Sequence, residues 1–161
     1  MEPITQPVEQ LEGTPLKITR HNAGLWQVTI DAPPLNLFGP ELLTGLEKVV
    51  RLMKATPELR VIVFDSAIPN YFIAYFDIVK GAEFVARKTP SGLLPWFDVA
   101  QALYDSPVIS IVAIRGRIRG VGIEFATACD MRFASEKAIF GQFEVGVGTM
   151  PAVAAWNSCR F

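Results

Sequence analysis

The sequence contains little cysteine, no excess of charge of either sign and no apolar run long enough to cross a bilayer. Its two cysteines, Cys129 and Cys159, cannot form a metal site by themselves, and one disulfide would be unusual in a chain so rich in apolar residues. We therefore expect a reducing, cytoplasmic setting and no bound metal. Residues 1–15 carry prolines and acids where a signal peptide needs a basic start and an apolar segment.

Charge is nearly balanced along the chain. Lys and Arg together number 15, Asp and Glu together number 16, and the formal net charge is −1. Without an overall positive field, the chain has no general attraction for nucleic acid or for an anionic membrane. We therefore expect small, roughly neutral ligands or protein partners.

Apolar residues, in contrast, make up 50% of the 161 residues. A chain of this length and composition can bury a substantial core as one domain. Three prolines and a glycine interrupt the polar start of the chain, so residues 1–15 are predicted to be a flexible lead. Order is expected to begin near Leu16.

Apolar residues recur first at strand spacing and then at helix spacing, and this order repeats. A hairpin with strands at 16–19 and 25–30 is predicted first, and a helix over 42–53 follows it. The same patterns predict strands at 61–64 and 71–73, a helix at 93–104, a strand at 108–114, a helix at 122–129 and strands at 131–133 and 138–140. Each strand-strand-helix unit has one apolar face that it cannot bury alone. We therefore predict an α/β fold in which about three units stack into a right-handed spiral.

A glycine-rich turn lies between a predicted strand and a predicted helix. Gly116, Gly120 and Gly122 allow two interpretations, both with backbone N–H groups at a helix N-terminus holding negative charge. One is the nucleotide turn of short-chain dehydrogenases. That turn should follow the first strand, and the expected tyrosine and lysine four apart are missing, since Tyr75 and Lys80 are five apart. The other interpretation is half of an oxyanion hole for a thioester enolate.

Two carboxylates, Glu124 and Glu144, flank this region twenty residues apart. Glu124 falls in the first turn of the predicted helix, beside Phe125 and Ala126, where partial desolvation lets a carboxylate exchange a proton near neutral pH. Each acid alone has an ordinary explanation, because Glu124 favours the helix dipole and Glu144 would lie in a surface loop. Together they indicate acid/base chemistry, which needs one group to give a proton and one to take it.

Around this turn the sequence resembles the crotonase superfamily, the enoyl-CoA hydratases and isomerases. The most specific match runs from Gly116 to Asp130, G-R-I-R-G-V-G-I-E-F-A-T-A-C-D, and is followed by A-S-E-K-A-I-F-G-Q-F-E-V-G-V-G-T-M-P. The resemblance extends from about Leu16 to Pro151 and implies a crotonase-like spiral core over residues 16–151. It also implies acyl-CoA thioester substrates, no cofactor beyond the coenzyme A of the substrate, and homotrimers or dimers of trimers.

The resemblance also implies roles for individual residues. Glu124 and Glu144 match the two hydratase glutamates, and the N–H groups of Val121 and Phe76 match the oxyanion hole. The implied substrate-binding residues are Ala74, Phe76, Asp77, Ile78, Gly120 and Gly122. The implied reaction is hydration of a trans-2-enoyl-CoA, in which a positioned water attacks Cβ and a proton is delivered to Cα. Two alternatives stay open: a double-bond isomerase or other acyl-CoA enzyme of the family, and a non-catalytic remnant that binds acyl-CoA.

Two departures from the family pattern lie near these residues. Tyr75 replaces a usual glycine and Phe76 is bulky, so a more aromatic mouth of the acyl pocket is expected. Arginines at positions 115, 117 and 119 replace residues that are commonly Asn or small. These arginines either form a solvated strand end, the interpretation we favour, or contact the CoA phosphates.

A third departure is expected at residues 152–161, a tail that we predict not to match the family. Members of the family continue after the proline matching Pro151 with a glycine-rich run and with helices that complete the acyl pocket and build the trimer. We hypothesise a frameshift, because codons for such a run, read one base out of register, can encode this tail. The expectation is then a truncated spiral without the trimerisation helices, with the trimer weakened or lost and the activity impaired.

Overall fold

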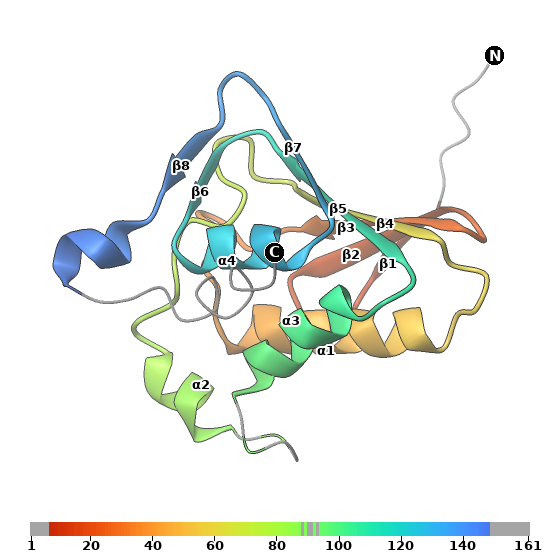
Figure 1. Ribbon diagram of the computed structural model, residues 1–161, viewed down its shortest axis with the longest axis horizontal. Helices are drawn as coiled ribbons and strands as arrows, with labels where there is room; N and C mark the ends of the chain where they lie inside the picture. Colours follow the sequence, from red (N-terminus) through yellow and green to blue (C-terminus); the bar gives the residue numbers. More distant parts are fainter. Residues whose placement is uncertain (1–6, 88, 90–91, 93, 149–161) are drawn as a thin grey trace.

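The fold is built on two sheets and is described by a computed structural model for residues 7–87, 89, 92 and 94–148. The larger sheet has six strands in the order β1-β2-β3-β4-β5-β7, and β6 pairs with β8 in a second sheet (Figure 1). The strands are β1 (Val8–Gln10), β2 (Leu16–Asn22), β3 (Leu25–Ile30), β4 (Val61–Ser66), β5 (Ile109–Ile114), β6 (Arg117–Arg119), β7 (Met131–Ala134) and β8 (Ile139–Gly141). The helices are α1 (Pro40–Lys54), α2 (Gly81–Ala86), α3 (Pro95–Tyr104), α4 (Val121–Ala128) and the 3-10 helix η1 (Phe143–Val147).

The large sheet is antiparallel at its start and parallel afterwards. β1, β2 and β3 pair antiparallel, whereas β3, β4, β5 and β7 pair parallel to one another. Parallel neighbours need a crossover connection, and in this chain helices occupy the crossovers. The predicted α/β class is therefore confirmed.

One face of this sheet is apolar and covered. The parallel register places Val28 beside Phe64 and Phe64 beside Val112, and all three side chains are fully buried. Helices α1 and α3 lie next to each other on one side of the sheet (Figure 1). The buried side chains of the sheet and of α1, α3 and α4 form a single cluster. One core thus supports both the sheet and α4, which begins directly after the glycine-rich turn.

Helix α1 forms where apolar residues recur at helical spacing. Its buried residues are Leu42, Leu43, Gly45, Leu46, Val49, Val50 and Met53. Pro40 stands at the start of the helix, where its missing N–H removes no helical hydrogen bond. The helix predicted over 42–53 is therefore confirmed, and those predicted over 93–104 and 122–129 are confirmed as α3 and α4.

The strand predicted at 71–73 is wrong. Instead of a ladder, this segment makes an isolated bridge between Tyr71 and Arg117, and the N–H of Phe72 donates to the carbonyl of Arg117 at 2.8 Å. Two residues further on, the N–H of Ala74 donates to the carbonyl of Leu35 at 3.2 Å. The segment changes partner too soon for a continuous strand. Strand-strand-helix therefore holds for β2-β3-α1 and β5-β6-α4, but not for the unit between them.

Residues 71–78 are called the middle segment below. Asn36 holds the loop between β3 and α1 against this segment. It is fully buried with a φ of 52°, a conformation that Asn tolerates better than most residues. Its Nδ2 donates to Ser66 Oγ at 2.7 Å and to the Phe72 carbonyl at 2.8 Å. Its Oδ1 accepts from the N–H of Ala32 at 2.8 Å. One amide thereby fixes the start of the segment that leads to Phe76.

The expected onset of order near Leu16 is also wrong. Val8 pairs with Thr19 and Gln10 pairs with Lys17, so a strand lies inside the range predicted as a flexible lead. The short polar strand β1 occupies the sheet edge, and its side chains are exposed. The tail at 152–161 lies outside the described residues.

Cys129 follows α4 directly and is 4% exposed. Burial, which disfavours the charged thiolate, raises the pKa of its thiol to about 12, against an ordinary value of 9.0. Next to it, the Asp130 carboxylate accepts from both the N–H and the hydroxyl of Ser110 at 2.7 Å. These bonds tie the end of α4 to β5.

We predict that stability falls above pH 9 in a way that depends on Cys129. Between pH 9 and 12 the unfolded thiol loses its proton while the buried thiol keeps it, so rising pH favours unfolding. Urea unfolding at pH 7.5, 9 and 10.5 should show a loss in the native chain that exceeds the loss in Cys129→Ala by about 2 kcal/mol at pH 10.5. Equal pH dependence of the two chains would contradict the burial of this thiol.

Candidate functional site

The glycine turn joins β6 to α4 through a conformation that favours glycine. Gly120 has a φ of 50° and a ψ of −123°, and α4 begins at the next residue, Val121. The N–H of Gly120 donates to the carbonyl of Gly141 at 3.0 Å, and its carbonyl accepts from Ile123 at 2.8 Å and from Glu124 at 3.2 Å. In the described part of the chain, the N–H of Val121 has no acceptor. The turn therefore presents an N–H at the positive end of a helix.

The middle segment packs directly on this turn. A Cβ added at Gly122 would lie 2.8 Å from the carbonyl oxygen of Ile73, and the N–H of Arg119 donates to that same oxygen at 3.1 Å. At Gly116, an added Cβ would lie 2.3 to 2.6 Å from backbone atoms of Asn70 and Tyr71. Such close approach leaves no room for side chains at these two glycines. It brings the segment of Phe76 alongside the start of α4.

Phe76, the second predicted oxyanion donor, forms an isolated parallel bridge with Phe38. The N–H of Phe38 donates to the Tyr75 carbonyl at 2.8 Å, and the N–H of Asp77 donates to the Phe38 carbonyl at 3.0 Å. Because successive backbone groups of an extended segment point in opposite directions, the N–H of Phe76 points away from Phe38. Phe76 and Val121 thus come from neighbouring segments, as a two-donor site requires.

Glu124 lies in the first turn of α4 and is 4% exposed. Its neighbours along the helix, Phe125 and Ala126, are also buried. A carboxylate in this place is shielded from bulk water, and it lies close to the positive end of its own helix. The predicted position in the first turn is therefore confirmed.

Glu144 reaches the same turn from another element. It belongs to η1, so its predicted place in a loop is wrong in detail, and it is half-buried. A Cβ added at Gly120 would lie 2.4 Å from Glu144 Oε1 and 3.0 Å from Phe143 Cε1. The carboxylate of Glu144 therefore occupies the space that a side chain at position 120 would need. The side chain of Glu144 therefore lies against Gly120, the residue that directly precedes the helix of Glu124.

The other predicted substrate-binding residues have different environments. Ala74 is fully buried, whereas Ile78 is 76% exposed. The Asp77 carboxylate accepts from the N–H groups of Val79 at 3.1 Å and Lys80 at 3.3 Å, so it shapes the turn before α2. Gly120 and Gly122 lie at the start of α4, where Ile73, the residue before Ala74, packs against Gly122.

The arginines that depart from the family pattern pack on their own neighbours. Arg115 pairs with Asp65 at 3.3 Å. Arg117 lies 5.6 Å from the centre of the Tyr71 ring, and Arg119 lies 5.5 Å from that of Tyr75. All three side chains have partners within the fold, which supports a structural role for them.

Sequence reasoning assigned no role to Gln142 or Phe143. Both polar atoms of the Gln142 amide are buried without a hydrogen-bond partner among the described residues, an arrangement that costs stability. Phe143 packs edge-on against Tyr75 with ring centres 5.4 Å apart. The only signal available beforehand was their position directly before Glu144.

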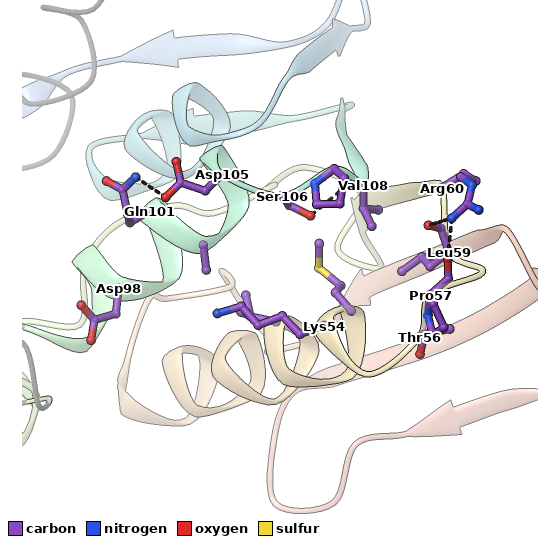
Figure 2. A pocket seen from close by; sticks show the side chains of 14 residues that line it. Lys54, Thr56, Pro57, Leu59, Arg60, Asp98, Gln101, Asp105, Ser106 and Val108 are labelled. Atoms are coloured by element: carbon purple, nitrogen blue, oxygen red, sulfur yellow. Dashed lines mark hydrogen bonds between the residues drawn. The ribbon is translucent and has the colours of Figure 1, made fainter.

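A hollow of about 750 Å³ lies away from this site, between the C-terminal parts of α1 and α3 (Figure 2). Met53, Leu59 and Val108 belong to its apolar lining, and Lys54 and Asp105 to its polar lining. None of the predicted site residues lines it. The grouping of carboxylates and backbone donors, and not the volume of a hollow, identifies the candidate site.

Within residues 7–87, 89, 92 and 94–148, no group of three or more His, Cys, Asp or Glu could hold a metal ion. Over the same residues, no helix is both long and apolar enough to cross a membrane.

Comparison with known proteins gives one family. The family model described as "Enoyl-CoA hydratase/isomerase" matches residues 20–160. The Arabidopsis thaliana protein named "Probable enoyl-CoA hydratase 2, mitochondrial" is 29% identical over 145 residues, which cover 84% of this chain and 45% of that protein. Mitochondrial methylglutaconyl-CoA hydratase of Mus musculus is 30% identical over 116 residues, which cover 72% of this chain and 37% of that protein.

Solved structures agree with this result. An enoyl-CoA hydratase from Mycobacterium avium subsp. paratuberculosis K-10 superposes with a TM-score of 0.74 at 26% identity, covering 91% of this chain and 57% of that one. This likeness confirms the predicted crotonase-like fold. The chain spans about half the length of the relatives that it matches, or less.

We predict that Gly120→Ala displaces Glu144. The added methyl group would meet Oε1 at 2.4 Å, and the backbone conformation is one that a residue with a side chain adopts at a cost of about 1–3 kcal/mol. Urea unfolding should show this loss, and the amide NMR signals of Phe143 and Glu144 should shift. Gly146→Ala is the matched control in η1, because a Cβ there meets nothing within 4 Å. Equal behaviour of the two variants would contradict the contact.

Proposed function

Because this chain belongs to the enoyl-CoA hydratase/isomerase family, whose members act on acyl-CoA thioesters, we propose that it carries a hydratase-type site that adds water across the double bond of a 2-enoyl-CoA. The observation that carries the proposal is the close approach of the Glu144 carboxylate to Gly120. Glu124 belongs to the first turn of the helix that starts at this glycine. One carboxylate therefore lies against the turn and the other belongs to the helix that follows it, which supports the two carboxylates and the backbone donor that hydration chemistry needs.

Two backbone N–H groups bind the thioester oxygen in this proposal. Val121 supplies one at the start of α4, and Phe76 supplies the other from the facing segment. As water adds to Cβ, negative charge develops on the thioester oxygen. The helix N-terminus favours that charge, and fixed donors of this kind are worth about 3 kcal/mol each in comparable sites.

The two glutamates handle the protons. One carboxylate accepts a proton from the attacking water as its oxygen bonds to Cβ, and the other carboxyl group delivers a proton to Cα. The sum is the addition of one water to the double bond, and both groups return to their starting states after one proton exchange with solvent. The different exposure of the two residues supports different roles for them. Glu124 is 4% exposed, whereas Glu144 is half-buried.

An isomerase of the same family is the second candidate. Moving a double bond requires one proton to be removed and returned, which a single carboxylate can perform. Product analysis separates the two reactions, because a 3-enoyl thioester yields a 2-enoyl thioester with an isomerase, whereas a hydratase converts the 2-enoyl thioester to a hydroxyacyl product. Binding of CoA thioesters without either product would favour the non-catalytic alternative.

We predict that Glu144→Gln and Glu124→Gln each lower kcat for hydration by on the order of 10²- to 10⁴-fold, the usual effect of removing a positioned acid or base. The reaction is followed as the loss of enoyl thioester absorbance. The assay uses this chain and a fusion that adds the C-terminal half of a family member, because the chain spans about half the length of its relatives.

The matched control is Glu136→Gln, which changes an exposed acid in the connection between β7 and β8. It should keep the unmodified rate. A Glu144→Gln variant that also keeps this rate would remove Glu144 from the mechanism, and the hydratase proposal would fail with it.

A further inference from the structure

Phe143 links the carboxylate of Glu144 to the opposite side of the site. Its ring packs edge-on against Tyr75, with ring centres 5.4 Å apart and an interplanar angle of 83°. Edge-to-face packing at this separation is a favourable aromatic geometry. The Phe143 ring also approaches Gly120, since Cε1 would lie 3.0 Å from an added Cβ. Phe143 therefore contacts both the middle segment and the glycine turn, directly before the residue whose carboxylate must be held.

Arg119 fixes the other end of this contact. Its guanidinium donates to the Tyr75 hydroxyl. Arg119 is the last residue of β6 and its N–H donates to Ile73, so its backbone is held by the segment that carries Tyr75. Arg119 and Tyr75 are both half-buried, which limits the competition from water for their bond. The Tyr75 side chain is thereby held by Phe143 at its ring and by Arg119 at its hydroxyl.

We propose that Tyr75, held by Arg119, is the positioning residue for Glu144: it packs on Phe143 and keeps the first turn of η1 on Gly120. This inference rests on the proposed function, because it assigns a purpose to the position of Glu144. Tyr75 acts through Phe143 and need not touch the substrate. Removing its ring should loosen the turn that carries the carboxylate while leaving the core in place.

A second tyrosine-arginine pair provides an internal control. Tyr71 bridges Arg117, whose guanidinium lies 5.6 Å from the Tyr71 ring centre, much as Arg119 lies 5.5 Å from that of Tyr75. Both tyrosines belong to the middle segment and both arginines belong to β6. The two pairs differ at η1, since the ring contact to Phe143 is made by Tyr75. Tyr71→Leu therefore removes an equivalent ring and leaves the contacts of Tyr75 with Arg119 and Phe143 unchanged.

The test compares steady-state kinetics of hydration in Tyr75→Leu, Tyr75→Phe and Tyr71→Leu. Tyr75→Leu should lower kcat by about 10- to 100-fold with KM within about twofold, because misplacing a reacting group by a small distance costs rate more than binding. Tyr75→Phe keeps the ring on Phe143 and should retain kcat within about threefold of the unmodified chain. Tyr71→Leu should leave kcat unchanged. Equal kcat values for Tyr75→Leu and Tyr71→Leu would overturn the proposal.

A double-variant cycle separates this role from an effect on Phe76, the neighbour of Tyr75. If Tyr75 acts through Glu144, adding Tyr75→Leu to Glu144→Gln should cost little further rate, because the two changes affect one function. If it acts through the N–H of Phe76, the second change should cost the full factor again, which would overturn the proposal. A Glu144→Gln chain with unmodified rate would instead remove the proposed function.

An NMR measurement tests the same inference without activity. In the native chain and in Tyr71→Leu, a nuclear Overhauser effect should connect the Phe143 ring to the α-protons of Gly120, as their close approach requires. It should be lost in Tyr75→Leu. Its persistence there would show that the ring of Tyr75 does not hold η1 against Gly120.

If Tyr75→Leu does not fold, Phe143→Leu provides the alternative variant, because it removes the other ring of the pair. It should lower kcat and leave KM nearly unchanged, as expected for Tyr75→Leu.

Discussion

The site depends on one close approach, that of Phe143 and Glu144 to the α-carbon of Gly120. Any side chain at position 120 would overlap the Glu144 carboxylate, with an added Cβ only 2.4 Å from Oε1. The same glycine directly precedes α4, whose first turn holds Glu124 and presents the N–H of Val121. A single backbone position thus connects the Glu144 carboxylate with the helix N-terminus. If the contact opens, the buried core would survive but the site would not.

The rest of the fold supplies support for this contact. Parallel pairing of β4, β5 and β7 directs the chain toward β6 and α4, and the apolar face of the sheet anchors α4 through Phe125, whose ring lies 5.0 Å from that of Phe64. From the other side, Asn36 fixes the start of the middle segment and Ile73 packs on Gly122. The N–H of Val121 and the side chain of Glu124 therefore belong to a helix that is anchored in the core, which limits their freedom to move, whereas Glu144 comes from η1, which buries none of its residues.

Local patterns predicted much of this arrangement. The apolar period of α1 and the alternation in β2 and β3 reflect burial of one face, which any sequence in such an element must satisfy. Glu124 could be placed in advance because a glycine-rich turn followed by a helix puts the next acid in the first turn. The strand predicted at 71–73 is wrong, since the hydrogen-bond partners of this segment are set by tertiary contacts and not by its own sequence. For the same reason, the sequence could not predict the approach of Glu144 to Gly120 or the ring contact between Tyr75 and Phe143.

We propose that the turn at Gly120 and the segment of Phe76 together form a donor site for a thioester oxygen. Difference infrared spectroscopy of a carbon-13-labelled 2-enoyl-CoA bound to the Glu144→Gln chain tests this most directly, because the slowed reaction leaves the substrate intact. Two N–H donors at the helix N-terminus should polarise the carbonyl and lower its stretching frequency relative to the free thioester. A bound thioester whose carbonyl frequency equals that of the free molecule would show that these N–H groups do not bind its oxygen.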